Sequence, residues 1–330
     1  MRLKSSVLLI ALLLLTVTAA LSIAIGSNQI PLLRTVELLF VPDSSFESTV
    51  VHEQRIPRTL LVIAVAAALG VAGAVIQSLT RNPLADPGIL GVNAGASLAV
   101  VLAVAVFGIA SIWFYLWFAF IGAALAAVVV YLLGSAGGSA ATPVRLALAG
   151  VAIGMAIFSL VQTVLLTNQQ AFNEFRFWAA GSAEGRGYPV LFAVIGFIVA
   201  GLILAFAIAP ALNAMALGDE AGKALGVNVT RTRVITMIAV TLLAGAATAA
   251  VGPISFIGLG VPYVARALCG SDQRWVLPAA ALLAPTMLLG ADIIGRVVAT
   301  PSEVQAGIVA AIIGGPVFVV IARKKRIESL

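Results

Sequence analysis

Two arginines, Arg55 and Arg58, stand three residues apart in the segment "RIPR", directly before an apolar run of about twenty residues. Residues at i and i+3 share one face of a helix, so both guanidinium groups would lie together where a membrane span begins. A guanidinium stays charged and can hold a carboxylate through two parallel hydrogen bonds. The pair therefore suits either a charged anchor at the membrane surface or a docking site for an acidic partner.

Groups that could support catalysis are scarce. The chain has one histidine, His52, and one cysteine, Cys269, so it can form neither an internal disulfide nor a metal site of the usual Cys/His type. The stretch "GDEAGKA" (218–224) is one residue short of a phosphate-binding loop and lacks the hydroxyl that follows its lysine. We expect no catalytic residue, no metal site and no cofactor in this chain.

The composition is that of an integral membrane protein. Hydrophobic residues make up 62% of the chain, charged residues only 10%, and the mean hydropathy is +1.14. Soluble domains carry about 25% charged residues. Apolar stretches of 18 or more residues indicate membrane-spanning helices. The basic residues are scattered between these stretches and not clustered with aromatics, which argues against nucleic-acid binding.

Hydropathy predicts ten helical crossings, with both chain ends on the same side. The first is interpreted as a retained span, because its apolar part is longer than a signal-peptide core. The eighth, "FIGLGVPYVARA", is too short to cross alone and would be a half-helix buried among its neighbours. The spans are expected near 5–25, 58–79, 91–107, 113–133, 144–166, 189–209, 232–252, 256–267, 276–293 and 304–321.

Charge orients these crossings. With the N-terminus inside, thirteen of the nineteen Lys and Arg residues lie in inner segments and six in outer ones, in agreement with the positive-inside rule. The "RIPR" arginines then lie outside, against the trend. Asp292 and Arg296, four residues apart near the outer end of the ninth span, are expected to pair with each other.

The source of energy is indicated by what the spans lack. An ion-coupled secondary transporter needs ionisable residues within its spans, and none is found at mid-span. Energy for uphill transport would therefore come from another subunit. The longest inner loop, 210–231, contains "ALGDEAGKALGVNV", which is either a two-helix elbow that fits a groove on a soluble partner or an ordinary surface loop.

A series of motifs gives the chain a family resemblance. It includes "RIPRTLLVIAVAAALGVAGAVIQSLTRNPLADPGILGVNAGAS", "FRFWAAGS", "LGDEAGKALGVNVTRTR" and "VGPISFIGLGVPYVARALCGSDQRWVLP". This series resembles the FecCD-type permease subunits of iron-siderophore, haem and cobalamin ABC importers, and looks closest to the ferric-enterobactin type. The resemblance implies an all-α integral membrane protein with the type II importer fold, about ten transmembrane helices, a single domain over 1–330 and both termini in the cytoplasm.

The resemblance also implies roles for individual residues. It assigns binding-protein docking at the outer face to Arg55, Arg58 and Arg296. It assigns ATPase coupling to Gly218, Asp219, Glu220, Leu225 and Gly226. It places an inner gate at Asn82, Leu84, Thr142 and Pro143. This chain departs from the cobalamin member before the fifth span, where Pro143 and Val144 replace small hydroxyl residues, so a hydroxyl-based gate would depend on Thr142.

The predicted function is therefore the permease of an importer that moves a ferric siderophore across the cytoplasmic membrane of a prokaryote. The implied partners are a second permease subunit, two ATPase subunits that would hold ATP and Mg²⁺, and an extracytoplasmic binding protein. The second permease could be another copy or a paralogue. Haem or cobalamin is the alternative cargo, and an ion-coupled transporter is the disfavoured alternative class.

Some assignments stay open on sequence alone. Gln77 could line the translocation path or make a buried hydrogen bond between helices. The stretches 70–74 and 93–97 are rich in small residues and indicate tight helix packing. The outer segment "LLRTVELLF" (32–40) could form a small amphipathic helix at the membrane surface.

Overall fold

The computed structural model describes residues 2–108, 111–136 and 143–323, and the regular structure in these ranges is helical. Ten helices match the ten expected spans in order. They are α1 (Arg2–Ala24), α4 (Ile56–Thr80), α5 (Val92–Phe107), α6 (Ile112–Ser135), α7 (Pro143–Thr167), α9 (Tyr188–Ala207), α12 (Val229–Val251), α13 (Ile257–Cys269), α14 (Gln273–Val298) and α15 (Ala306–Arg323).

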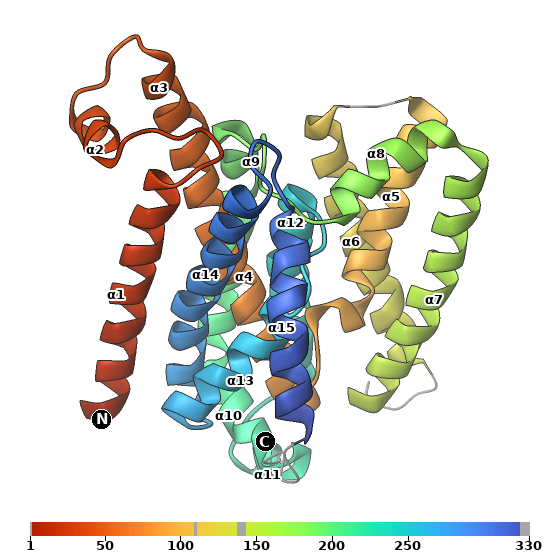
Figure 1. The fold of residues 1–330 in the computed structure, drawn as a ribbon. Coiled ribbons are helices and arrows are strands. Elements are labelled where there is room, and N and C mark those ends of the chain that lie inside the picture. The colour runs from red at the N-terminus through yellow and green to blue at the C-terminus, as the bar shows by residue number, and fades with distance from the viewer. Residues whose placement is uncertain (1, 109–110, 137–142, 324–330) are drawn as a thin grey trace.

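Shorter elements connect the spans. They are α2 (Leu32–Phe40), α3 (Phe46–Thr49), the π-helical turn η1 (Val50–Arg55), the 3-10 turn η2 (Pro87–Leu90), α8 (Gln169–Ala179), α10 (Ala209–Ala216) and α11 (Asp219–Ala224). Figure 1 shows α1 beginning, and α15 ending, at the end of the bundle where α10 and α11 lie, while α2, α3 and α8 lie at the opposite end. This arrangement agrees with an even number of crossings.

Among the described residues, seven helices are long and apolar enough to cross a membrane unaided, and α5, α13 and α15 are shorter. The half-helix expected near 256–267 is confirmed as α13. The chain leaves α12 through Gly252 at φ +80° and enters α13 at Phe256 in the left-handed region. Ile254, between them, is buried. Such non-helical backbone is tolerated at membrane depth only because protein surrounds it.

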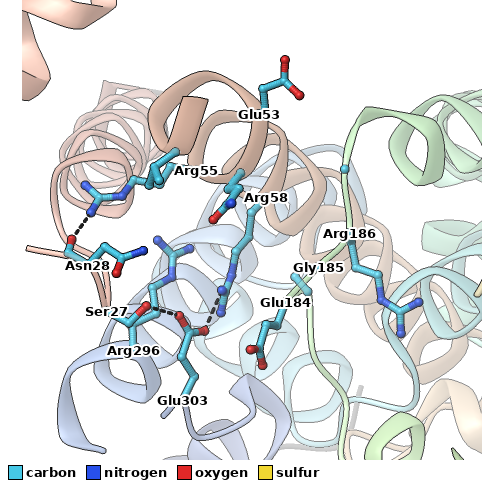
Figure 2. Close-up of a pocket in the computed structure, with 15 residues that line it drawn as sticks. Ser27, Asn28, Glu53, Arg55, Arg58, Glu184, Gly185, Arg186, Arg296 and Glu303 are labelled. Atoms are coloured by element: carbon cyan, nitrogen blue, oxygen red, sulfur yellow. Dashed lines mark hydrogen bonds and ion pairs between the residues drawn. The ribbon is translucent and has the colours of Figure 1, made fainter. Parts of the chain in front are cut away.

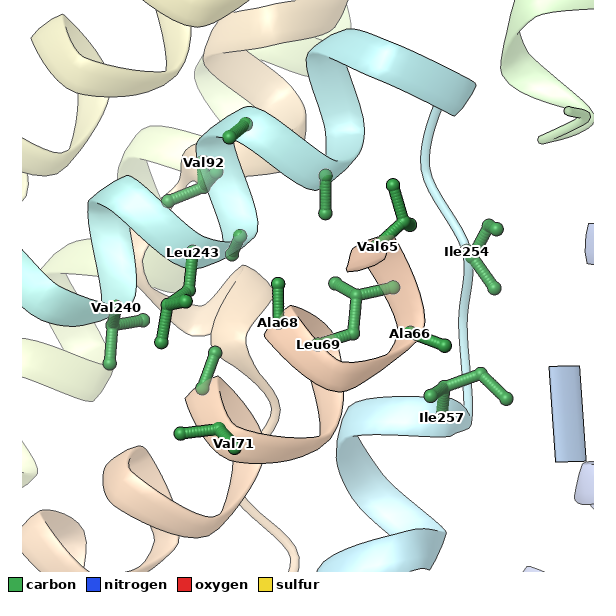
Figure 3. Close-up of a cluster of buried hydrophobic side chains, with 14 of the residues drawn as sticks. Val65, Ala66, Ala68, Leu69, Val71, Val92, Val240, Leu243, Ile254 and Ile257 are labelled. Atoms are coloured by element: carbon green, nitrogen blue, oxygen red, sulfur yellow. The ribbon is translucent and has the colours of Figure 1, made fainter. Parts of the chain in front are cut away.

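The core forms around α4, which is buried along most of its length. Figure 3 shows its side chains between Val240 and Leu243 of α12 on one side and Ile254 and Ile257 on the other. Small residues allow this approach: a Cβ on Gly73 would lie 1.8 Å from the carbonyl oxygen of Gly258. The tight packing predicted for 70–74 is confirmed there.

The second small-residue stretch also packs closely. A Cβ on Gly95 of α5 would lie 2.2 Å from the carbonyl oxygen of Gly122 in α6. Without a hydrophobic driving force between helices in lipid, close packing of this kind is what holds spans together.

Candidate functional site

A pocket of about 410 Å³ opens at the outer end of the bundle, between segments that are far apart in the sequence. Residues 26–28 after α1, the η1–α4 junction, residues 183–187 before α9, and the α14–α15 connection line it (Figure 2). Arg55, Arg58 and Arg296, the three predicted docking arginines, all lie in this pocket. The fold therefore brings together the residues that the resemblance selected.

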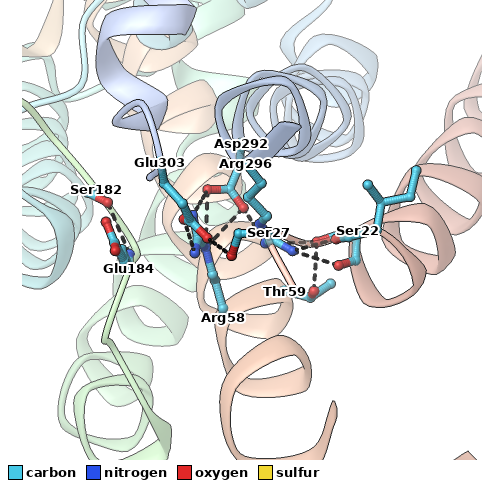
Figure 4. A network of polar contacts seen from close by, with 10 residues as sticks. Ser22, Ser27, Arg58, Thr59, Ser182, Glu184, Asp292, Arg296 and Glu303 are labelled. Atoms are coloured by element: carbon cyan, nitrogen blue, oxygen red, sulfur yellow. Dashed lines mark hydrogen bonds and ion pairs between the residues drawn. The ribbon is translucent and has the colours of Figure 1, made fainter. Parts of the chain in front are cut away.

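Arg58 is held by two carboxylates of this chain. Its Nη2 donates to Oδ1 of Asp292 at 2.6 Å, and its Nη1 donates to Oε2 of Glu303 at 2.7 Å. The side chain of Asp292 is fully buried, whereas those of Arg58 and Glu303 each keep 11% of their surface exposed. Glu303 also accepts a hydrogen bond from Ser27 at 2.8 Å, so the pair is tied to the segment after α1 (Figure 4).

Arg296 shares the same aspartate. Its Nη2 donates to Oδ2 of Asp292, which confirms the i, i+4 pair predicted from the sequence. Its Nη1 donates to the carbonyl oxygens of Ser22, at 2.7 Å, and Ile25, at 3.2 Å. Ser22 in turn shares a 2.8 Å hydrogen bond with Thr59 of α4. One buried carboxylate therefore links α14 to α1 and α4.

Arg55 has a different kind of partner. Its guanidinium donates to the carbonyl oxygens of Ile23, at 2.9 Å, Ala24, at 2.8 Å, and Asn28. The last carbonyls of a helix lack intrahelical partners and carry partial negative charge, so a cation there stabilises the helix end. Arg55 thus caps α1. All three predicted docking arginines have guanidinium groups bound by their own chain, and docking itself stays a prediction.

Arg186 is the exception in this pocket. It is 9% exposed, and its guanidinium makes no hydrogen bond or ion pair with another described residue. Burial lowers the pKa of Arg186 to about 10, because removing a cation from water disfavours its charged form. Figure 2 shows its side chain directed away from Arg58 and Glu303. Sequence reasoning counted Arg186 only as an outer base, since nothing in "AEGRG" indicates burial.

At the inner end, α10 and α11 form the helical elbow that was one of two possibilities for the loop 210–231. Gly218 (φ +114°) and Gly226 (φ +82°) stand at the two ends of α11 in conformations that favour glycine. Asp219 accepts hydrogen bonds from Arg81, at the end of α4, and from Arg233 of α12. The elbow is thereby fastened to two spans.

The predicted coupling residues divide into two groups. Asp219 faces inward to Arg81 and Arg233, neither of which the sequence indicated as its partner. Glu220, with its side chain 88% exposed, and Leu225, 63% exposed, face solvent. Leu217, which sequence reasoning missed, is also largely exposed. The free surface of the elbow therefore combines two exposed leucines with the exposed ion pair between Glu220 and Lys223.

The two predicted gate elements lie side by side. A pocket of about 300 Å³ is lined by Asn82 from the loop after α4 and by Val144 and Leu148 from the start of α7. Leu84 is partly exposed in the same loop. Pro143 is the first residue of α7. Thr142 lies outside the described residues.

Gln77 makes the buried hydrogen bond between helices that was one of its two possible roles. Its Nε2 donates to the carbonyl oxygen of Leu259 at 3.1 Å, and its Oε1 accepts from Arg266. Trp178, from the motif "FRFWAAGS", is also buried in the core. Within the described ranges of the chain, no group of three or more His, Cys, Asp and Glu residues is placed to hold a metal ion.

Comparison with known proteins decides the family. The model of the FecCD transport family matches residues 13–324. The chain belongs to the FecCD transport family. It is 45% identical, over 95% of its length and 94% of the relative's, to the ferric enterobactin transport system permease protein of Escherichia coli. It is 39% identical to the Fe(3+)-citrate import system permease protein of Bacillus subtilis, over 96% and 94% of the two chains.

The fold comparison agrees. A metal-chelate type ABC transporter, described in an inward-facing conformation, superposes with a TM-score of 0.86 at 26% identity, covering 97% of this chain and 99% of the other. The expected type II importer fold is confirmed. This member of the FecCD family is a multi-pass permease subunit of a bacterial inner-membrane ABC importer, a transport component without catalytic activity. Such importers work with ATPase and binding-protein partners.

The network around Asp292 gives the first prediction. Replacing Asp292→Asn leaves Arg296 buried without a carboxylate and removes one of the two carboxylates that hold Arg58. Because breaking a buried ion pair costs about 3–5 kcal/mol, we expect a large loss of thermal stability in the purified protein.

Glu37→Gln is the matched control. It breaks an ion pair of comparable length with Arg34, in which the glutamate side chain is 59% exposed, and such pairs contribute about 0–1 kcal/mol. Equal melting temperatures for the two variants would show that the Asp292 network does not hold the outer end of the bundle together.

Proposed function

We propose that this chain forms half of a membrane passage for an intact ferric siderophore, moved by alternating access that separate ATPase subunits drive. The observation that carries the proposal is that ion-pair networks lie at both ends of α4. Arg58 anchors the outer pocket to α4, and Arg81 anchors the inner elbow. A binding protein outside and an ATPase inside would therefore act on the same helix.

The exposed face of α7 supports a passage between two permease subunits. It carries Met155 and Phe158 together with the polar residues Ser159, Gln162 and Thr163. The hydroxyls of Ser159 and Thr163 donate to carbonyl oxygens of α7 itself, whereas an amide such as that of Gln162 typically hydrogen-bonds to a neighbouring helix. A second permease subunit facing α7 would complete such a passage. Either a second copy of this chain or a paralogue would serve.

The ferric siderophore is preferred as cargo because the relatives that match most of the chain handle ferric chelates. Their names specify ferric enterobactin and Fe(3+)-citrate. A hemin transport permease of Yersinia pestis is 36% identical over 82% of this chain, so haem is the second candidate. Iron would enter as part of the cargo and would need no ligand from the permease.

Docking at the outer pocket would work by exchange of partners. Asp292 is fully buried and inaccessible, whereas Glu303 lies on the α14–α15 connection and binds Arg58 from the pocket side. An acidic residue of the binding protein would replace Glu303 on Arg58. Several such ion pairs would set the orientation and rate of docking more than its affinity.

Coupling would begin at the exposed side of the elbow. Leu217, Glu220 and Leu225 are exposed and would contact an ATPase, while Asp219 would transmit movement of the elbow to Arg81. Arg81 directly precedes Asn82 of the inner gate. A shift of the elbow would thus be transmitted to the inner gate through a single ion pair, the one between Asp219 and Arg81.

The cargo is tested by uptake. Proteoliposomes that hold the complete transporter and ATP should accumulate labelled ferric siderophore when its loaded binding protein is added, because the family and the relatives specify this class. Uptake of haem under the same conditions, with none of the siderophore, would overturn the cargo assignment and leave the importer class standing.

For docking, we expect Arg58→Gln to abolish stimulation of ATP hydrolysis by the binding protein. The rate at which the binding protein associates should fall about tenfold, with a smaller loss of affinity. Breaking the Arg58–Asp292 pair lowers stability, but Asp292 keeps its pair with Arg296, so the protein should still fold, and a melting curve checks this.

Arg34→Gln is the control, since Arg34 is another outer arginine paired with acids but does not line the pocket. A second variant, Glu303→Gln, weakens the competing internal partner and should tighten docking. Normal stimulation in Arg58→Gln, or weaker docking in a stably folded Glu303→Gln, would contradict docking by exchange.

Substitutions on the two sides of the elbow should have different effects on ATPase binding and on transport. Leu225→Asp places a charge on the exposed apolar surface and should release the ATPase subunits during purification. Asp219→Asn should keep them bound but reduce transport per ATP several-fold, since coupling through such networks is worth about 0.5–2 kcal/mol.

Glu220→Gln removes the neighbouring exposed charge and leaves the Asp219–Arg81 pair intact, so it distinguishes loss of an ATPase contact from loss of the pair. If Asp219→Asn transports as efficiently per ATP as the unaltered protein, the ion pair with Arg81 does not transmit the movement.

A further inference from the structure

The outer segment that contains α2 exposes an unusual amount of apolar surface. Leu33 is 86% exposed, Phe40 81% and Phe46 71%, and Leu32 and Val41 are also largely exposed. The other outer helix, α8, exposes two large hydrophobic side chains, those of Phe172 and Phe177. Scattered single exposures are ordinary, but a contiguous apolar patch marks an interaction surface.

The exposed apolar side chains of α2 itself lie on one face: Leu32, Leu33, Val36, Leu39 and Phe40. At 100° per residue, positions 32, 33, 36, 39 and 40 fall within an arc of about 120°. Thr35 and Leu38, on another side of the helix, are buried. Arg34 and Glu37 occupy the remaining side. The helix is therefore amphipathic, with an apolar face turned away from the rest of the protein.

The orientation of this face is fixed by polar contacts. Arg34 donates to Glu37 at 2.9 Å, to Glu47 at 3.1 Å and to Asp43, which ties α2 to the turn before α3. Hydrogen bonds from the side chain and backbone of Ser45 lower the pKa of Asp43 to about 2, so its carboxylate stays charged. The ring of His52 in η1 bonds to the carbonyl oxygen of Leu38 at 2.9 Å.

We propose that α2 is an in-plane membrane anchor, with its apolar face inserted in the outer leaflet of the bilayer. Figure 1 shows α2 at the edge of the bundle, just beyond the outer end of α1 and nearly end-on, so that its axis runs across that of α1. Helices that lie in the interface in this way bury their apolar face at the boundary between headgroups and acyl chains.

The apolar face of α2 would contact lipid because it continues the lipid-facing surface of α1. α1 is exposed along its length, through Leu9, Leu13, Val17 and Leu21, and as a span at the edge of the bundle it meets lipid there. Only residues 25–31 separate α1 from α2. The apolar face of α2 also lacks the charges that a partner held by ion pairs would need, and none of its residues lines the arginine pocket.

The anchor would set the position of the outer pocket. α2 is joined through His52 to η1, and η1 leads directly into Arg55 and Arg58. Insertion of α2 would hold these arginines at a constant depth relative to the membrane surface. Insertion of α2 in the membrane does not depend on which cargo is carried.

Site-directed spin labels test the anchor in the complete transporter, placed in nanodiscs of phosphatidylethanolamine and phosphatidylglycerol. In a Cys269→Ala background, Leu33→Cys and Phe40→Cys place a label on the apolar face, and Glu37→Cys places one on the polar side of the same helix. We expect labels at 33 and 40 to collide several-fold more with oxygen, and less with a water-soluble nickel complex, than the label at 37.

Equal access of the nickel complex to positions 33, 37 and 40 would overturn the proposal. So would labels at 33 and 40 that are open to water until the binding protein is added, because the face would then be a protein contact. Phe40→Trp gives a second measurement that does not need the labels. Its added fluorescence should be quenched by lipids with brominated acyl chains, and unchanged fluorescence would contradict insertion.

Discussion

The carboxylate of Asp292 fixes the arrangement of the outer end of this permease. The side chain of Asp292 is fully buried and is bound by Arg58 of α4 and by Arg296 of its own helix. Arg296 also donates a hydrogen bond to the carbonyl oxygen of Ser22 in α1. Removing such charges from water is costly, and the cost is offset only when their hydrogen-bonding groups find partners. Three spans must therefore meet in one geometry for the network to form.

The inner end repeats this arrangement with different residues. Asp219 accepts from Arg81 and Arg233, as Asp292 accepts from Arg58 and Arg296, and in both places one of the arginines belongs to α4. Between these two ends α4 is almost entirely buried and approaches α13 so closely that Gly73 cannot gain a side chain. The helix is thus held at both ends by charge and in the middle by contact of backbones.

The sequence predicts what depends on local pattern. Hydropathy locates the ten spans, the short eighth run predicts α13, and spacing pairs Asp292 with Arg296. It does not reveal that Arg58 meets Asp292, 234 residues away, or that Arg55 caps α1. The side of the membrane indicates where an arginine lies, but not whether it is buried, so the internal partners of the docking arginines could not be predicted. The ion pairs of Asp219 with Arg81 and Arg233 could not be predicted for the same reason.

The half-helix α13 has an electrostatic consequence. It begins at Ile257, after an extended stretch that returns from the outer end of α12, so its first N–H groups lie inside the membrane (Figure 1). The N-terminus of a helix carries a partial positive charge. The first turn of α13 thereby brings partial positive charge into the bundle, and Pro87, which follows Asp86, packs against it at Gly258. That charge comes from the backbone, so no cationic side chain has to be carried into the bilayer to produce it.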